Sequence, residues 1–314
     1  MMKRRKFLVG ASAALACAEM GLTAARAAES GTGLRLKTCV FSPMFRPLPL
    51  KTAMETAGAI GYDGIEIGAG YGTDHLDVNC TPERAREIKA MAAKNKLALV
   101  LIYSSLGSTI LQGEKQRAEA LAGVERFLVI GQEMECKMLK VGAGSLKNSA
   151  FQLEEARVVA NWLAQVCDRA AQHGTRVATE IHFGQYCETA NMAARMIDLV
   201  NRPNYGVIHD AGNMHIVADS YVDEAVKLLG QRIFHVHVKD MVKADPADPK
   251  AHNYPAGRFK RAPLNQGNVN HRGLFQALAR IGYNGYLSCE ATGSDDPAAV
   301  AKYEFAEMQK LLRS

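Results

Sequence analysis

Residues that could bind a metal ion occur at the ends of four β-like segments in the second half of the chain. They are Glu180, Asp210, Glu290 and one imidazole from the His235/His237 pair. Three carboxylates and an imidazole that are buried together are unstable unless a positive charge lies among them. A divalent cation would supply that charge. Oxygen-rich ligands with one imidazole and no thiolate favour Mn²⁺ or Mg²⁺, with Co²⁺ or Zn²⁺ as the alternatives.

Four separate segments can hold one ion only if the fold brings their ends together. From residue 36 onward, short apolar runs alternate with longer amphipathic stretches, a pattern typical of βαβ units. The eight predicted strands are residues 36–41, 64–68, 98–103, 138–142, 176–182, 205–210, 233–239 and 285–290. The predicted helices include residues 82–94, 114–134, 154–173, 222–229, 274–281 and 297–312.

This alternation predicts an α/β fold, a (β/α)8 TIM barrel that forms a single domain over residues 28–314. An open, doubly wound sheet usually has a glycine-rich phosphate turn after its first strand, but here residues 42–45 read SPMF. In a barrel, the C-terminal ends of all the strands meet at one face. One acidic strand end is usually a helix cap or an ion-pair partner, whereas four metal-binding ends in register predict a common cation.

One connection is unusually long and polar. It runs from about residue 241 to 270 and contains four prolines and Arg258. A connection of this length in a compact domain is usually functional or disordered. Because it follows the seventh predicted strand, we expect it to overhang the face on which barrel enzymes place their active sites.

Several segments resemble one family of barrel enzymes. Residues 61–67 (GYDGIEI) look like its second strand and residues 235–240 (HVHVKD) like its seventh, while 263–270 (PLNQGNVN) and 281–286 (IGYNGY) are similar to the segment that leads to its last metal-binding glutamate. The chain thus resembles the xylose isomerase-like barrels, or sugar phosphate isomerases/epimerases, which include the ketose 3-epimerases and the endonuclease IV group. The resemblance covers about residues 36–312.

The resemblance implies roles for particular residues. Glu180, Asp210, His237 and Glu290 would be the metal ligands, and Glu180 and Glu290 would double as the catalytic acid and base. His237 is the histidine of its pair that aligns with the family's ligand, which leaves His235 deeper and structural.

Substrate-binding candidates surround these ligands. Many epimerases of the family carry a substrate-binding histidine three residues after the metal-binding aspartate; here that position is Asn213, and His215 lies two residues further on. The other candidates are His182, Lys239, Glu66 and Arg258. Two of these have an alternative role that is at least as well supported by the sequence. Glu66 could be a buried, hydrogen-bonded carboxylate, and Arg258 could be a solvated cation on the loop.

The predicted reaction is proton transfer beside a carbonyl group of a small carbohydrate, through a metal-bound enediolate. It needs a base at the C–H bond and a positive group at the oxygen where charge accumulates. Return of the proton gives an isomerase or epimerase. Loss of a neighbouring substituent instead gives a lyase or dehydratase on a keto-sugar or keto-glycoside. An endonuclease IV-like nuclease would need three zinc ions and further histidines, and residues 101–105 (LIYSS) provide none. A non-catalytic sugar-binding protein would not need both glutamates.

The N-terminus predicts an exported protein. Residues 3–8 (KRRKFL), an apolar stretch and Ala-x-Ala at 25–27 resemble a twin-arginine signal peptide over residues 1–27, which predicts a periplasmic location. Lipid anchoring through Cys17 is not expected, because the aliphatic residue usually found three positions earlier is missing.

Charge and hydropathy limit the partners. Cleavage after Ala27 would remove five basic residues and one acidic residue, which leaves 33 basic against 31 acidic residues and a net charge of +2. Without a concentrated basic stripe, nucleic acid is not an expected partner. Apolar runs are shorter than the roughly 20 residues that span a bilayer, so no membrane association is expected after cleavage. A homo-oligomer is compatible with the sequence.

Overall fold

The computed structural model describes residues 36–70, 73, 75–146, 151–291 and 294–313. Residues 36–312 within these ranges belong to one compact unit. No helix among the described residues is both long and apolar enough to cross a membrane. The predicted signal peptide, with Cys17, lies outside the described residues.

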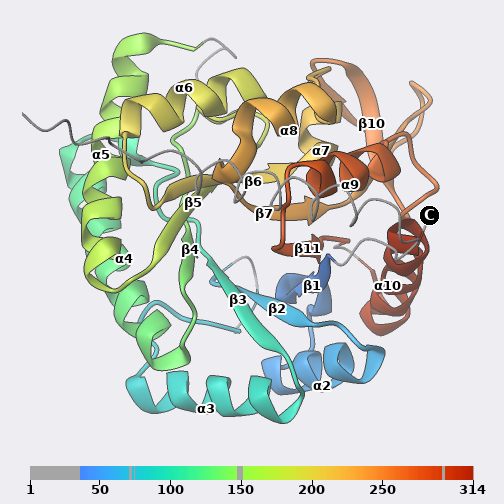
Figure 1. The fold of residues 1–314 in the computed structure, drawn as a ribbon, viewed down its shortest axis with the longest axis horizontal. Helices are drawn as coiled ribbons and strands as arrows, with labels where there is room; N and C mark the ends of the chain where they lie inside the picture. Colours follow the sequence, from blue (N-terminus) through green and yellow to red (C-terminus); the bar gives the residue numbers. More distant parts are fainter. Residues whose placement is uncertain (1–35, 71–72, 74, 147–150, 292–293, 314) are drawn as a thin grey trace, which may run out of the picture. The chain divides into compact units, whose positions relative to one another are not determined.

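The described residues form a closed barrel of eight parallel strands, which confirms the predicted (β/α)8 fold (Figure 1). Around the barrel the strands follow the order β1-β11-β7-β6-β5-β4-β3-β2, and β2 pairs with β1 to close it. Their bounds are β1 Lys37–Phe41, β2 Gly64–Gly68, β3 Ala98–Tyr103, β4 Met138–Lys140, β5 Arg176–Glu180, β6 Tyr205–Asp210, β7 Ile233–Val238 and β11 Tyr286–Cys289. Each lies within two residues of its predicted bounds.

Helices surround the barrel (Figure 1). They are α2 Leu50–Ile60, α3 Pro82–Lys94, α4 Glu114–Met134, α5 Leu153–Gln172, α6 Ala190–Val200, α7 Ala211–His215, α8 Asp223–Leu229, α9 His271–Arg280 and α10 Pro297–Arg313, with short 3₁₀ helices at Ser42–Phe45, Ile110–Gln112 and Gly230–Arg232. Helix α9 begins before the predicted residue 274 because Asn270 caps it: its side chain accepts a hydrogen bond from the backbone N–H of Gly273.

Alternation along the strands decides which side chains enter the barrel. Val236 and Val238 on β7 pack in the main core with the helices. The residues between and before them, His235 and His237, therefore point to the barrel interior. The same parity sends Asp210 inward from the end of β6. Charged and imidazole groups thus collect in the interior at the strand ends, while apolar groups anchor the outer surface of the sheet.

The connection over residues 241–270, which the sequence predicts as one long loop, instead contains three strands. Strands β8 Asp240–Lys243, β10 Gly257–Ala262 and β9 His252–Tyr254 pair antiparallel in the order β8-β10-β9. We call residues 240–262 the β-arm. These strands are short and rich in polar residues, and their pairing partners lie up to about 20 residues away along the chain, so no local apolar alternation marks them.

Asp240 attaches the β-arm and the following turn to the barrel. Its buried carboxylate accepts hydrogen bonds from the backbone N–H groups of Met241 (2.9 Å), Gly267 (3.0 Å) and Val269 (3.1 Å). Gly267 is required for this contact, since a Cβ atom there would lie 2.1 Å from Oδ1 of Asp240. One carboxylate therefore fixes where the arm leaves the barrel and where the chain returns.

We predict that Asp240→Ala loosens the β-arm. The substitution leaves three backbone N–H groups without their acceptor, and a hydrogen bond to a charged group is worth about 1.5–3 kcal/mol. The free energy of unfolding, measured by urea denaturation, should fall by about 3 kcal/mol. Asp245→Ala is the control, because Asp245 accepts one hydrogen bond, from the exposed N–H of Ala247. An equal loss in both variants would contradict the anchoring role.

Candidate metal centre

Four groups converge at the C-terminal ends of neighbouring strands. Glu180 ends β5, Asp210 ends β6, His237 lies near the end of β7 and Glu290 directly follows β11. One ligand atom from each lies within 4.8 Å of the others. The Glu290 side chain is 12 % exposed, and the other three are buried. The structure therefore brings together all four residues that the sequence nominated as ligands.

The Nδ1 atom of His237 is the centre of this cluster. It lies 3.3 Å from Glu180 Oε1, 3.2 Å from Glu290 Oε2 and 3.7 Å from Asp210 Oδ2. Although it is buried, Nδ1 has no hydrogen-bond partner among the described residues. With the hydrogen on Nε2, a lone pair on Nδ1 would face three carboxylates, which is unfavourable without a cation between them. The donor set therefore fits a divalent metal ion bound by one nitrogen and three carboxylate groups.

Glu66 lies inside the barrel beneath this cluster. It is completely buried, and its oxygens lie 3.2 Å from His237 Nε2, 2.9 Å from His235 Nε2 and 2.9 Å from Ser288 Oγ. Burial alone would raise the pKa of Glu66, but His237 and His235 lower it to about 2. Of the two roles predicted for Glu66, the structure thus supports the buried, hydrogen-bonded carboxylate and not the substrate-pocket residue.

Glu66 can set the state of the ligand above it. A carboxylate that accepts from Nε2 fixes the tautomer in which Nδ1 is free to bind a metal. Glu66, His235 and His237 are also close enough to form a second metal-binding group, which shares His237 with the first. Because Glu66 already contacts His235, His237 and Ser288, we interpret it as a group that orients His237.

Lys239 brings a positive charge to the mouth of the cluster. Its Nζ lies 2.7 Å from Asp210 Oδ2 and 2.9 Å from Glu290 Oε2. Burial would lower the pKa of Lys239, but the charges of Asp210, Glu290 and Glu180 raise it. The ammonium group therefore remains charged and stabilises the ionised carboxylates. It approaches them from one side of the cluster, where it contacts Asp210 and Glu290.

Glu180 is held by neutral donors. Its Oε1 accepts a hydrogen bond from Asn213 Nδ2 (3.0 Å), and its Oε2 accepts one from the Tyr103 hydroxyl group. The backbone N–H of Asn213 also donates to Asp210 Oδ1 (2.9 Å). Asn213, a predicted substrate-binding residue, thus contacts two of the four ligands. Tyr103 was not predicted, although it occupies the last position of β3 and its ring stacks against His237 with centroids 5.6 Å apart.

Glu290 is held by cations. Lys239 donates to its Oε2, and Arg261 donates to its Oε1 (3.0 Å) and to its backbone carbonyl oxygen. Arg261 comes from β10 of the β-arm. Sequence reasoning missed it, because only a strand assignment for the arm would indicate which of its basic residues faces the barrel.

The remaining candidates lie at or beyond the edge of the cluster. His182 follows β5 and is half-buried, and its Nδ1 atom lies 2.7 Å from the carbonyl oxygen of Phe183. It is also near enough to Glu180 to contribute to the lowered pKa of that carboxyl group. His215 packs edge-on against Phe259 and Tyr221, with ring centroids 5.5 and 5.8 Å away.

Arg258 does not face the cluster. Its guanidinium donates to the carbonyl oxygens of Asp248 (2.8 Å) and Ala251 (3.0 Å) and to Asn253 Oδ1 (3.2 Å). The prediction of a substrate-pocket residue is therefore corrected: Arg258 ties together the turn of the β-arm. Arg258 and Arg261 lie three residues apart on the same strand, but Arg258 contacts the turn of the β-arm and Arg261 contacts Glu290.

The ionisation of the three carboxyl groups follows these contacts. Burial would raise the pKa of each group. Without a cation in the cluster, His237 takes up a proton itself: burial would lower its pKa, but Glu66 and the three carboxylates raise it well above the ordinary value. A bound metal ion would replace that proton. Despite burial, the pKa values of Glu180 and Glu290 lie well below the ordinary value, because protonated His237 favours the charged form of Glu180 while Lys239 and Arg261 favour that of Glu290. The pKa of Asp210 is raised, because burial and the neighbouring charges of Glu290 and Glu180 outweigh Lys239.

The sequence of the chain matches a family model over residues 54–311, that of the xylose isomerase-like TIM barrel. The chain belongs to this family. It is 24% identical over 250 residues to an L-ribulose 3-epimerase of Methylomonas sp. (strain DH-1), with 78% of this chain and 79% of that protein covered. It is 26% identical over 267 residues to an inosose dehydratase of Geobacillus thermodenitrificans, with 78% and 82% covered.

Solved structures share the fold. A xylose isomerase domain protein from Planctomyces limnophilus superimposes with a TM-score of 0.70 at 19% identity, covering 89% of this chain and 96% of that one. A xylose isomerase-like TIM barrel protein from Mycobacterium smegmatis in complex with magnesium has a TM-score of 0.68 at 17% identity, covering 88% and 97%. The relatives to which the chain is similar thus include both an epimerase and a dehydratase.

We predict that the cluster binds one divalent ion. After treatment with EDTA, the protein should take up one equivalent of Mn²⁺ in isothermal titration calorimetry. Asp210→Asn removes one charged ligand and should weaken binding by at least about 100-fold, more than the loss of an outer contact costs. Asp248→Asn, on the exposed turn of the β-arm, should leave the affinity unchanged. Equal affinity in all three proteins would contradict the site.

Glu66→Gln tests the orienting contact. The amide has a single acceptor oxygen, so it cannot accept from His237, His235 and Ser288 together. We expect the affinity for Mn²⁺ to fall about 10- to 100-fold with the stoichiometry preserved. The matched control is Glu188→Gln, a buried glutamate whose carboxylate accepts from the N–H of Gly184 away from the cluster. Unchanged affinity for Glu66→Gln would show that His237 needs no such support.

Proposed function

We propose that the protein is a divalent-metal-dependent sugar isomerase or epimerase that moves a proton at the carbon next to a carbonyl group. The observation that supports this most directly is the buried Nδ1 of His237, which has no hydrogen-bond partner in the described part of the chain and lies within 3.7 Å of three carboxylates. A metal bound there would act as a Lewis acid on a substrate carbonyl and its neighbouring hydroxyl. The similarity to epimerases and dehydratases supports this class of chemistry.

Two glutamates can move the proton. Glu180 approaches from β5 and Glu290 from β11, with β6 and β7 between them in the barrel. A substrate between them would meet one carboxylate on each side, so that one glutamate can remove a proton and the other can return it to the opposite face. Tyr103 and Asn213 orient Glu180, and Lys239 and Arg261 orient Glu290.

A lyase is the second candidate, because two nitrogen groups lie at the mouth of the same cluster. Lys239 lies 2.9 Å from Glu290, and His182 is half-buried near Glu180. Either could donate a proton to a leaving group on the carbon next to the one that loses its proton. The similarity to an inosose dehydratase supports this alternative.

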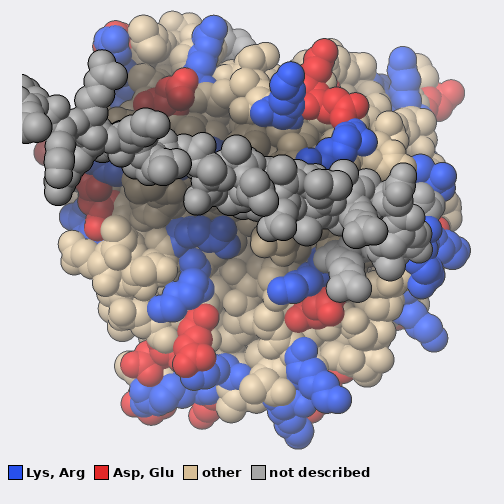
Figure 2. Space-filling view, in the orientation of Figure 1, with Lys and Arg blue, Asp and Glu red and all other residues tan. Residues whose placement is uncertain are grey.

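We also propose Mn²⁺ or Mg²⁺ as the metal and a small carbohydrate as the partner. The oxygen-rich ligand set supports a hard cation, and a family member was solved with magnesium. On the face drawn in Figure 2, acidic and basic side chains are interspersed over its described part, which supports a small-molecule partner over nucleic acid. Residues 1–27 support export to the periplasm.

Exchange of substrate hydrogen with solvent tests the proposal. The Mn²⁺-loaded protein is incubated in D₂O with a panel of ketoses, oxidised sugars and 3-keto-glycosides and followed by NMR. We expect metal-dependent deuterium incorporation next to the carbonyl, which Glu180→Gln should slow by about 100- to 10,000-fold and the buried control Glu188→Gln should not. Release of a leaving group would identify the lyase. Binding without exchange or release across the panel would refute an enzymatic role.

A further inference from the structure

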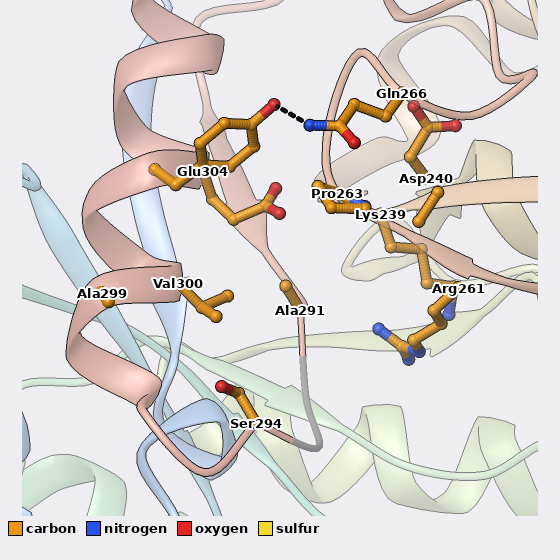
Figure 3. A pocket seen from close by; sticks show the side chains of 12 residues that line it. Lys239, Asp240, Arg261, Pro263, Gln266, Ala291, Ser294, Ala299, Val300 and Glu304 are labelled. Atoms are coloured by element: carbon orange, nitrogen blue, oxygen red, sulfur yellow. Dashed lines mark hydrogen bonds between the residues drawn. The ribbon is translucent and has the colours of Figure 1, made fainter.

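A pocket lies beside the metal cluster. It has a volume of about 450 Å³, within the range of small-molecule sites. Its walls come from the C-terminal ends of β7 and β11, the end of the β-arm with the turn that follows, and the first half of α10 (Figure 3). Ala291, one residue after the ligand Glu290, forms part of the wall.

Two cations join this pocket to the cluster. Lys239 and Arg261 both line the pocket, and their charged ends contact the two carboxylate oxygens of Glu290. The pocket therefore adjoins the cluster at Glu290. We call this space the α10 pocket.

The wall of the α10 pocket is mainly apolar. Its apolar groups are Ala262, Pro263, Ala291, Ala299, Val300 and the ring of Tyr303. Most polar groups in the wall already have partners: the Tyr303 hydroxyl donates to the Leu264 carbonyl (3.1 Å) and accepts from Gln266 (2.9 Å; Figure 3), and Asp240 accepts three backbone hydrogen bonds. The pocket thus suits an apolar group better than a second sugar ring, which would need many hydrogen bonds.

A buried carboxyl group disfavours an anion in the same space. Glu304 is only 2% exposed, and Figure 3 shows its carboxyl group directed toward the pocket. It accepts one hydrogen bond, from the N–H of Leu264 (3.2 Å). Burial raises the pKa of Glu304 to about 7, although that N–H partly opposes the shift. Because Lys239 and Arg261 are already paired with Glu290, a phosphate or carboxylate would find no unpaired cation among the described residues of the wall.

We propose that the α10 pocket is a second part of the substrate site, which binds an uncharged, mainly apolar substituent attached to the sugar. This inference rests on the proposed function and narrows the substrate to a glycoside, or a related conjugate, whose aglycone is an aromatic or similar apolar group. The sugar would occupy the metal cluster, and the substituent would lie against α10. A free or phosphorylated sugar would leave the pocket unused.

Matched glycosides test this proposal. Isothermal titration calorimetry with the Mn²⁺-loaded protein compares methyl, phenyl and 4-carboxyphenyl glycosides of glucose, galactose and xylose. We expect at least one phenyl glycoside to bind about 10-fold or more tightly than its methyl partner, because the ring is removed from water in the pocket. The corresponding carboxyphenyl glycoside should bind more weakly than the phenyl one.

Two substitutions on one helix localise the effect. Ala299→Phe fills the α10 pocket from an exposed position on α10 and should remove the preference for phenyl over methyl. Ala306→Phe makes the same change at an exposed position of α10 outside the pocket and should keep the preference.

Each contrary result would overturn the proposal: equal binding of phenyl and methyl partners, binding of no pair, tightest binding of the carboxyphenyl member, or an unchanged preference in Ala299→Phe. The deuterium exchange assay reports on the proposed function separately, because it needs only the metal cluster. Exchange with simple ketoses but no phenyl preference would reject the α10 pocket alone.

Discussion

The structure depends on the burial of three carboxylates and one imidazole at the same point. Closure of the barrel brings the ends of β5, β6, β7 and β11 together, and the alternation of side chains along these strands turns the four groups inward. Like charges at such distances repel strongly in a poorly solvated site. Lys239 and Arg261 offset part of this repulsion from one side. Nδ1 of His237, for which the described residues offer no hydrogen-bond partner, marks the place where a further positive charge is needed.

The two glutamates of the cluster have different surroundings, although both could bind the same ion. Neutral groups, the Tyr103 hydroxyl and the Asn213 amide, orient Glu180. Two cations, Lys239 and Arg261, orient Glu290. Pairs of carboxyl groups in unlike environments commonly divide the roles of acid and base. We therefore propose that the two glutamates divide these roles, with Glu180, whose side-chain hydrogen-bond donors are neutral, as the base.

Sequence reasoning recovered the barrel because each strand and helix has a strong local pattern, and the strand ends in turn indicated the four clustered groups. It left two alternatives open, or missed a residue, where position depends on contacts between distant segments. Glu66 lies in the middle of β2, so its depth in the barrel separates it from the mouth. Arg258 and Arg261 look alike in the sequence, and only the pairing of β10 with β8 distinguishes them. Tyr103 also lies at the C-terminal end of a strand, as the four clustered residues do. Its phenol group could therefore have been predicted as part of the site. The signal peptide stays a prediction.

The metal cluster and the α10 pocket are built from different parts of the chain. Barrel strands supply the four clustered groups, whereas the β-arm, the turn after it and α10 supply most of the pocket wall. Changes in the arm or in α10 can therefore alter which molecule fits without disturbing the groups that we propose move the proton. Asp240 connects the two parts, since it begins β8 just after Lys239 and its carboxylate fixes the chain on both sides of the arm. Through that anchor the β-arm places the guanidinium group of Arg261 against Glu290. Any substrate group that displaces Arg261 would therefore also change the charge around Glu290, which we propose as a catalytic carboxylate.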